Sequence, residues 1–165
     1  MKYLALFTVL LFSPGFAQEA EKEAAPTAAA GSKVALTQEE LEKKFTDTMT
    51  SAVMSGRWCL IEDGKLGPDK DDKYTIASVV KNTDGSWIIT AKIEYAGLTF
   101  NAPVPVQVKW AGDTAVIVVD NMGLPGTAKY SARVLVHEDT YSGTWSGGGT
   151  GGLMYGVVKK AEEKK

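Results

Sequence analysis

The chain of 165 residues has few of the side chains from which catalytic and metal sites are usually built. It contains one cysteine, Cys59, and one histidine, His137. A single cysteine cannot form a disulfide within the chain, which excludes a disulfide-stabilised scaffold and favours a small buried side chain for Cys59. One imidazole, with no thiolate or second imidazole near it in sequence, argues against a metal site and against Ser–His catalysis. No cofactor, metal ligand or catalytic residue is therefore predicted.

Strong charge and long hydrophobic runs are also missing. The formal net charge is −2, so the chain as a whole has no attraction for nucleic acid or for an anionic lipid surface. The apolar run at residues 3–12 has about half of the roughly 20 residues that a membrane-spanning helix needs. No later run is long enough, so no membrane span is predicted.

The N-terminal residues have the order of a secretory signal. Lys2 precedes the apolar run, the helix breakers at 13–15 follow it, and small residues at Gly15 and Ala17 suit a signal peptidase. We therefore expect residues 1–17 to be a signal peptide cleaved near Ala17, and a small protein of bacterial type exported to the periplasm or secreted. Residues 18–35, rich in Glu, Ala and Lys, indicate a flexible linker.

A single amphipathic helix is predicted over residues 37–53. Thr37 and Glu40 have the spacing of a capping box at its start. Leu41, Phe45, Met49 and Val53 repeat every four residues and form a narrow apolar stripe. The polar remainder of the helix is expected to face water, so the helix should pack on its own domain by this stripe.

From residue 55 onward the hydrophobic pattern has a period of two residues, which is typical of half-buried antiparallel strands. Short turns, including Asp84-Gly85, separate the apolar runs. The pattern predicts about eight strands, at 55–62, 73–81, 86–95, 98–109, 114–120, 127–137, 139–146 and 152–160.

Short links between successive strands predict a mainly β fold, an antiparallel meander that closes into a small barrel or stays an open, curled sheet. We expect the meander to close, with the domain at 36–160 and a charged tail at 161–165. Pro103 and Pro105 lack N–H donors, so part of their strand should be bulged or unpaired. A closed eight-stranded barrel has an interior that is either filled or holds one small ligand.

Three polar or glycine-rich segments resemble functional sites in composition, but each is better explained as a surface feature. The acidic run at 69–72 lacks the glycine and distal glutamate of a calcium loop, and Lys70 and Lys73 offset its charge, which indicates a solvated loop. The run at 147–152 matches G-x-G-x-x-G, but a strand rather than a helix follows it, so a flexible hairpin loop or barrel rim is expected. His137 is predicted to lie on the outer face of its strand.

The aromatic side chains are the candidate ligand-binding residues. They fall on predicted strands or strand ends, and most lie on the apolar face of their strand. In a narrow barrel they either fill the core or line a cup. The set is Trp58, Trp87, Tyr95, Trp110, Tyr130, Trp145 and Tyr155.

Two short motifs resemble those of calycin-type barrels. The segment at 55–58, Ser-Gly-Arg-Trp, resembles the Gly-x-Trp at the start of the first lipocalin strand. The segment at 141–145, Tyr-Ser-Gly-Thr-Trp, resembles the Gly-Thr-Trp of avidins. The resemblance implies a lipocalin- or avidin-type barrel over residues 54–160. It also implies a basic residue over the Trp58 ring, with Lys159 and Lys160 as the candidates.

Taken together, these patterns predict an exported, non-enzymatic protein that binds a small apolar or amphipathic ligand in a β-barrel. The alternative is a structural or interaction protein of the cell envelope or extracellular space, with a filled barrel. A third hypothesis, a barrel enzyme, requires convergent carboxylates or an inward-facing His137.

Overall fold

The structure is a computed structural model that describes residues 35–95, 97–123 and 128–162. The predicted signal peptide, nearly all of the predicted linker and the end of the charged tail lie outside these residues. The described part of the chain forms one helix and nine strands: α1 (Gln38–Met49), β1 (Ala52–Glu62), β2 (Lys65–Leu66), β3 (Lys70–Lys81), β4 (Trp87–Tyr95), β5 (Leu98–Ala111), β6 (Thr114–Met122), β7 (Tyr130–His137), β8 (Thr140–Gly147) and β9 (Thr150–Lys160).

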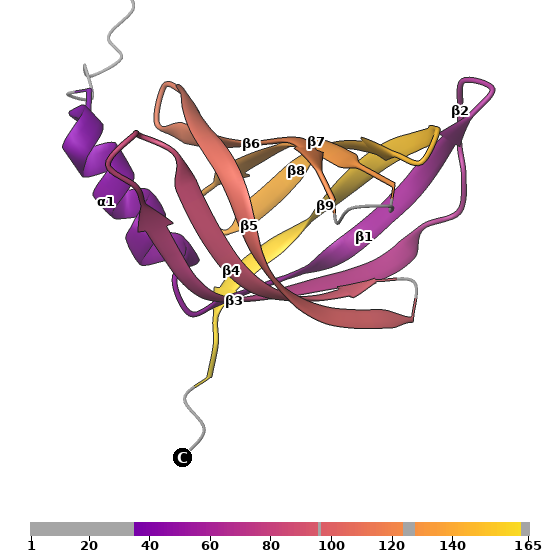
Figure 1. The fold of residues 1–165 in the computed structure, drawn as a ribbon, viewed down its shortest axis with the longest axis horizontal. Helices are drawn as coiled ribbons and strands as arrows, with labels where there is room; N and C mark the ends of the chain where they lie inside the picture. Colours follow the sequence, from indigo (N-terminus) through magenta and orange to yellow (C-terminus); the bar gives the residue numbers. More distant parts are fainter. Residues whose placement is uncertain (1–34, 96, 124–127, 163–165) are drawn as a thin grey trace, which may run out of the picture. The chain divides into compact units, whose positions relative to one another are not determined.

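The strands form a closed antiparallel barrel (Figure 1). Each long strand pairs with the next along the chain, and β9 pairs back to β1 from Ala52↔Lys160 to Leu60↔Gly152. Eight strands make the barrel, and the two-residue β2 folds back on the end of β1. The predicted fold class, a mainly β meander that closes after a single helix, is confirmed. This architecture is compatible with a calycin-like fold.

Helix α1 begins as predicted and ends earlier than predicted. The Thr37 side chain accepts a hydrogen bond from the Glu40 backbone N–H, and Glu40 bonds the Thr37 backbone in return. The helix stops at Met49 instead of continuing to residue 53. Ser51 has a positive φ of 54°, which turns the chain out of the helix, so Val53 belongs to β1.

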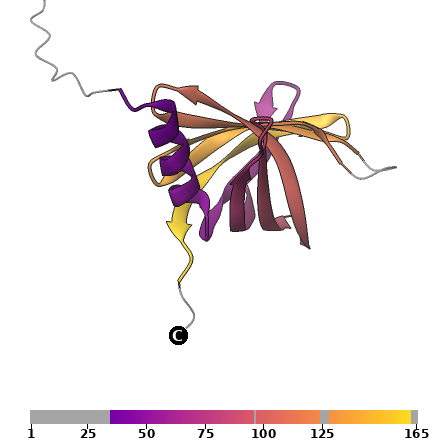
Figure 2. The same ribbon diagram turned by 60° about the vertical axis from the view of Figure 1, so that its left-hand side comes forward.

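Helix α1 lies at one end of the barrel (Figures 1 and 2), and Leu41, Phe45 and Met49 of its apolar stripe are buried. The Phe45 ring meets Trp87 and Trp110 edge-on, with centroids 5.5 Å and 6.2 Å apart. Such aromatic pairs add stabilisation beyond the area that they bury. Lys81 at the end of β3 also bonds the Glu42 carboxylate at 2.7 Å. The helix therefore closes this end of the barrel.

The prolines of β5 lie where the strand has one neighbour. Residues 98–106 of β5 pair with β4, whereas β5 pairs with β6 only from Gln107 to Ala111. Pro103 and Pro105 keep regular register with β4, so the strand has no bulge there. On the side that faces β6 these residues have no backbone pairing, which is the other of the two predicted alternatives. Among the described residues, the wall is therefore not closed by backbone hydrogen bonds between the first part of β5 and the end of β6.

Candidate functional site

The barrel encloses an apolar cavity of about 270 Å³. Met49 of α1 contributes to its lining and is fully buried, so the helix forms the closed end. All eight barrel strands contribute side chains, with Trp145 from β8 and Met154 from β9. Most of the lining is aliphatic: Met54, Ile76, Ile89, Ala91, Ile93, Val104, Val106, Ile117, Val119, Met122, Ala132 and Val134. Such a surface offers dispersion contacts and the hydrophobic effect as its main means of binding.

Other lining side chains mark where the cavity reaches solvent. Phe100 of β5 and Tyr130 of β7 both line the cavity, yet 41% and 39% of their surfaces are exposed. They lie on strands at either side of the incompletely paired β5–β6 region. Met122, at the end of β6, lines the same region. The cavity therefore opens between apolar side chains, away from the end closed by α1.

The seven predicted aromatic residues fall into different environments. Trp58, Tyr130 and Trp145 line the cavity. Trp87 and Trp110 pack against Phe45 at the helix end. Tyr155 lies on the outer face, 44% exposed, and its hydroxyl donates to Asp69 at 2.9 Å. Tyr95 is in β4 opposite Leu98, and its side chain is outside the described part of the structure. Some of the predicted aromatic residues therefore line the cavity, and others fill the core at the helix end.

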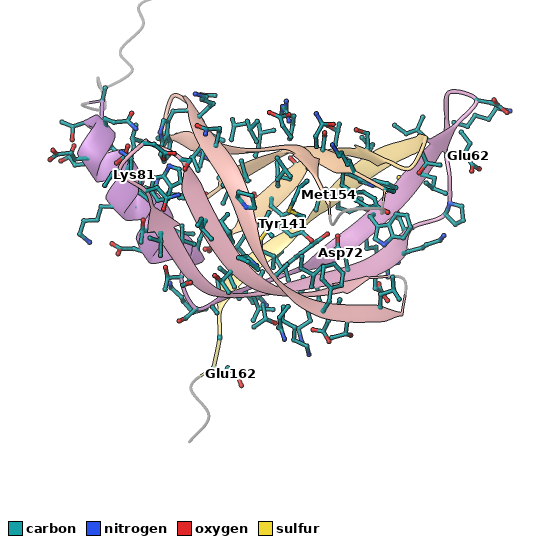
Figure 3. The ribbon with its side chains drawn as sticks, in the orientation of Figure 1. Glu62, Asp72, Lys81, Tyr141, Met154 and Glu162 are labelled. Carbon is teal, nitrogen blue, oxygen red and sulfur yellow. The ribbon has the colours of Figure 1, made fainter. Side chains whose placement is uncertain are left out.

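A buried polar row crosses the barrel interior beside the cavity. In register, Tyr141 of β8 lies opposite Gly156, which lies opposite Gly56, which lies opposite Asp72. The two glycines leave room for the Tyr141 ring, since a Cβ at Gly156 would lie 2.7 Å from its Cε1 atom. The Tyr141 hydroxyl donates to the Asp72 carboxylate at 2.7 Å (Figure 3). One side chain thereby joins strands β8 and β3 across two others.

Asp72 is the polar residue that sequence reasoning missed. It was assigned to a solvated loop, but it lies in β3 and is only 5% exposed. Tyr74 donates a second hydrogen bond at 3.3 Å. Burial raises the pKa of Asp72, and the two tyrosine hydroxyls oppose that rise. Burial and the neighbouring carboxylate likewise raise the pKa of Tyr141, so its hydroxyl remains a donor. The start of the strand was not recognised because residues 69–73 are all charged and the apolar alternation begins only at Tyr74.

A lysine covers the aromatic part of the lining. The Trp58 and Trp145 rings meet edge-on at 5.5 Å, and the Lys70 ammonium lies 4.8 Å from the centre of the Trp58 ring. The basic residue over Trp58 is therefore Lys70, not Lys159 or Lys160 as the resemblance suggested. Lys160 instead donates to the carbonyls of Asp47 and Thr50 at the end of α1.

The remaining candidates behave as surface or core groups. His137 is exposed on the outer side of β7, as predicted, and its Nδ1 atom lies 2.9 Å from the Thr114 hydroxyl. Cys59 is buried, as predicted. Gly148 and Gly149 form the β8–β9 turn with positive φ, within the predicted hairpin loop. In the described ranges, no three His, Cys, Asp or Glu side chains are grouped so that they would hold a metal ion.

Comparisons of this chain with protein-family models, curated proteins and solved structures give no significant match. Among the residues that the structure describes, no helix is both long and apolar enough to cross a membrane.

Proposed function

We propose that this protein is a non-enzymatic binding protein that holds a small apolar or amphipathic ligand inside its barrel. The proposal depends chiefly on one observation, the apolar cavity that reaches solvent between Phe100, Met122 and Tyr130. A barrel with a structural role alone gains stability from a filled interior, because unfilled space forfeits packing contacts. The cavity therefore favours a carrier over the accessory protein with a filled barrel.

The cavity volume limits the size of the ligand. It exceeds the roughly 150 Å³ of an apolar cavity that holds benzene, and it is close to the lower end of the usual range for ligand pockets, about 300 Å³. Binding by burial of apolar surface yields about 25 cal/mol per Å². The expected ligand is a compact hydrophobic molecule or the tail of a short amphiphile.

Two further features fit this proposal. Asp72, beside the cavity, accepts hydrogen bonds from the hydroxyls of both Tyr74 and Tyr141, an arrangement that fixes these side chains. The Gly-x-Trp at 56–58 and the barrel topology support a calycin-type carrier as the class of protein. The signal-like residues 1–17 support an exported, periplasmic or secreted location.

A titration with the neutral fluorophore N-phenyl-1-naphthylamine tests this function. The wild-type protein should enhance its fluorescence with saturation at one molecule per chain. Ala132→Phe adds a ring to the cavity wall opposite Trp145 and should weaken binding by about tenfold or more, because it occupies the space of the ligand.

Gln107→Phe is the matched control, since it adds the same ring to an exposed position of β5. It should leave the affinity unchanged. Absence of saturable binding to the wild type, or equal effects of the two substitutions, would contradict the proposed function.

A further inference from the structure

The charged side chains at the start of β3 point alternately to the inner and outer faces of the barrel. Residues 70–72 pair with β1, so Lys70 shares a face with Asp72 and with the cavity-lining Trp58, which is its register partner. Asp71 lies opposite Arg57 on the other face. Successive side chains of a strand point to opposite faces, so Lys70 and Asp72 face inward.

Each aspartate of this segment already has a partner. Asp69 accepts from the Tyr155 hydroxyl at 2.9 Å, and Asp71 lies 3.5 Å from the Arg57 guanidinium. Asp72 accepts from Tyr141 and Tyr74 inside the barrel. Three carboxylates within two positions of Lys70 are therefore engaged elsewhere.

Lys70 has no ion pair with any carboxylate in the described part of the chain. Its ammonium lies over the face of Trp58 at the exposed start of β3, and the Trp145 ring meets Trp58 edge-on. By contrast, Lys81 bonds Glu42 at the helix end and Lys92 bonds Glu94. Lys70 is thus a cation held beside the apolar lining with its charge available to a further partner.

We infer that the ligand carries an acidic head group, which Lys70 binds at the rim while the apolar tail lies in the cavity beside Trp58. This inference rests on the proposed function and adds the chemical class of the ligand. A carboxylate is the simplest such head group. This places the charge of the ligand beside the Lys70 ammonium, which lies over the ring of the cavity-lining Trp58.

The nearby Asp72 does not oppose this arrangement. Its carboxylate is almost fully covered, and the hydroxyls of Tyr141 and Tyr74 donate to it. The head group would lie at the exposed side of Lys70, where solvent screens the remaining charge of Asp72. A cationic head group would instead meet the Lys70 ammonium at the rim and be disfavoured.

Three amphiphiles with the same tail test the inference: decanoate, decanol and decyltrimethylammonium, each titrated by calorimetry into the full chain at low and high salt. The wild type should bind decanoate about fivefold to tenfold more tightly than decanol, with decyltrimethylammonium weakest. The preference for decanoate should shrink at high salt, because the charge lies at an exposed rim.

Lys70→Gln should remove the preference for decanoate and leave the affinity for decanol unchanged, and Lys70→Arg should retain the preference. Lys73→Gln is the matched control, because Lys73 is exposed on the opposite face of the same strand. Circular dichroism confirms that each variant is folded.

The outcomes separate the two proposals. Equal affinities for the three amphiphiles, or a preference that survives Lys70→Gln, would overturn the acidic head group and leave the carrier function intact. Failure of all three amphiphiles and of N-phenyl-1-naphthylamine to bind would overturn both.

Discussion

At the scale of single residues, the Tyr141–Asp72 hydrogen bond is a buried interaction between distant parts of the chain. It joins residues 69 positions apart, and it exists because Gly56 and Gly156 have no side chains in the path of the Tyr141 ring. A buried carboxylate that loses a hydrogen bond retains its desolvation cost, so the bond should matter more than its distance alone suggests.

Tyr141→Phe removes the hydroxyl donor and keeps the ring. We expect it to lower the free energy of unfolding by about 1–3 kcal/mol, because Asp72 then loses the nearer of its two tyrosine hydroxyl donors. Denaturant unfolding measures the change. Tyr155→Phe removes an exposed hydroxyl that also bonds an aspartate, and it should cost no more than about 0.5 kcal/mol. Similar losses in the two variants would contradict the role assigned to the buried bond.

Asp72 should also make stability depend on pH. Its pKa in the folded protein is raised above the ordinary value of 3.8, mainly by burial. Between that value and the raised one, the folded protein binds more protons than the unfolded chain, so the contribution of Asp72 to stability falls as pH rises. The unfolding free energy of the wild type minus that of Asp72→Asn should therefore decrease as pH rises above about 4 and then level off. An increase over this interval would show that the folded pKa is lowered instead.

At the scale of elements, helix α1 acts as the closed end of the barrel. Its stripe of Leu41, Phe45 and Met49 is buried, and the Phe45 ring contacts two tryptophans from different strands. The helix thereby joins β4 and β5 at this end of the barrel.

Phe45→Ala tests this closure. Truncation of a buried phenylalanine typically costs about 3–5 kcal/mol, and here it also uncovers Trp87 and Trp110. We expect a loss in that range by denaturant unfolding, together with a red shift of tryptophan emission in the folded protein. Lys43→Ala, at an exposed position of the same helix, should cost about 0.5 kcal/mol or less. A comparably small loss for Phe45→Ala would mean that the helix is dispensable for the barrel.

At the scale of the whole molecule, much of the fold follows from local patterns. Alternation in β4, β5 and β7 identified strands and their inner faces, because a half-buried strand needs that period. The capping box identified the start of α1. Its end was placed too late because Val53 continues the four-residue repeat, although Ser51 turns the chain.

The candidate site was less predictable, because it depends on register between distant segments. Nothing local distinguishes Trp58 and Trp145, which line the cavity, from Trp87 and Trp110, which pack against the helix. The charges around Asp72 resembled a solvated loop until pairing with β1 placed it inside. The sequence also does not show why residues 56 and 156 are glycines, because their role is to leave room for the Tyr141 ring, which lies across both.

The central claim is that the barrel carries a ligand, and the most direct test is the mass of the protein purified from its native cells and their medium under non-denaturing conditions. The account predicts a reproducible excess mass of a few hundred daltons that is lost on denaturation and is absent from Ala132→Phe. Wild-type protein that shows only the mass of its own chain, takes up no apolar probe and forms a discrete oligomer would contradict the carrier function and favour an accessory role.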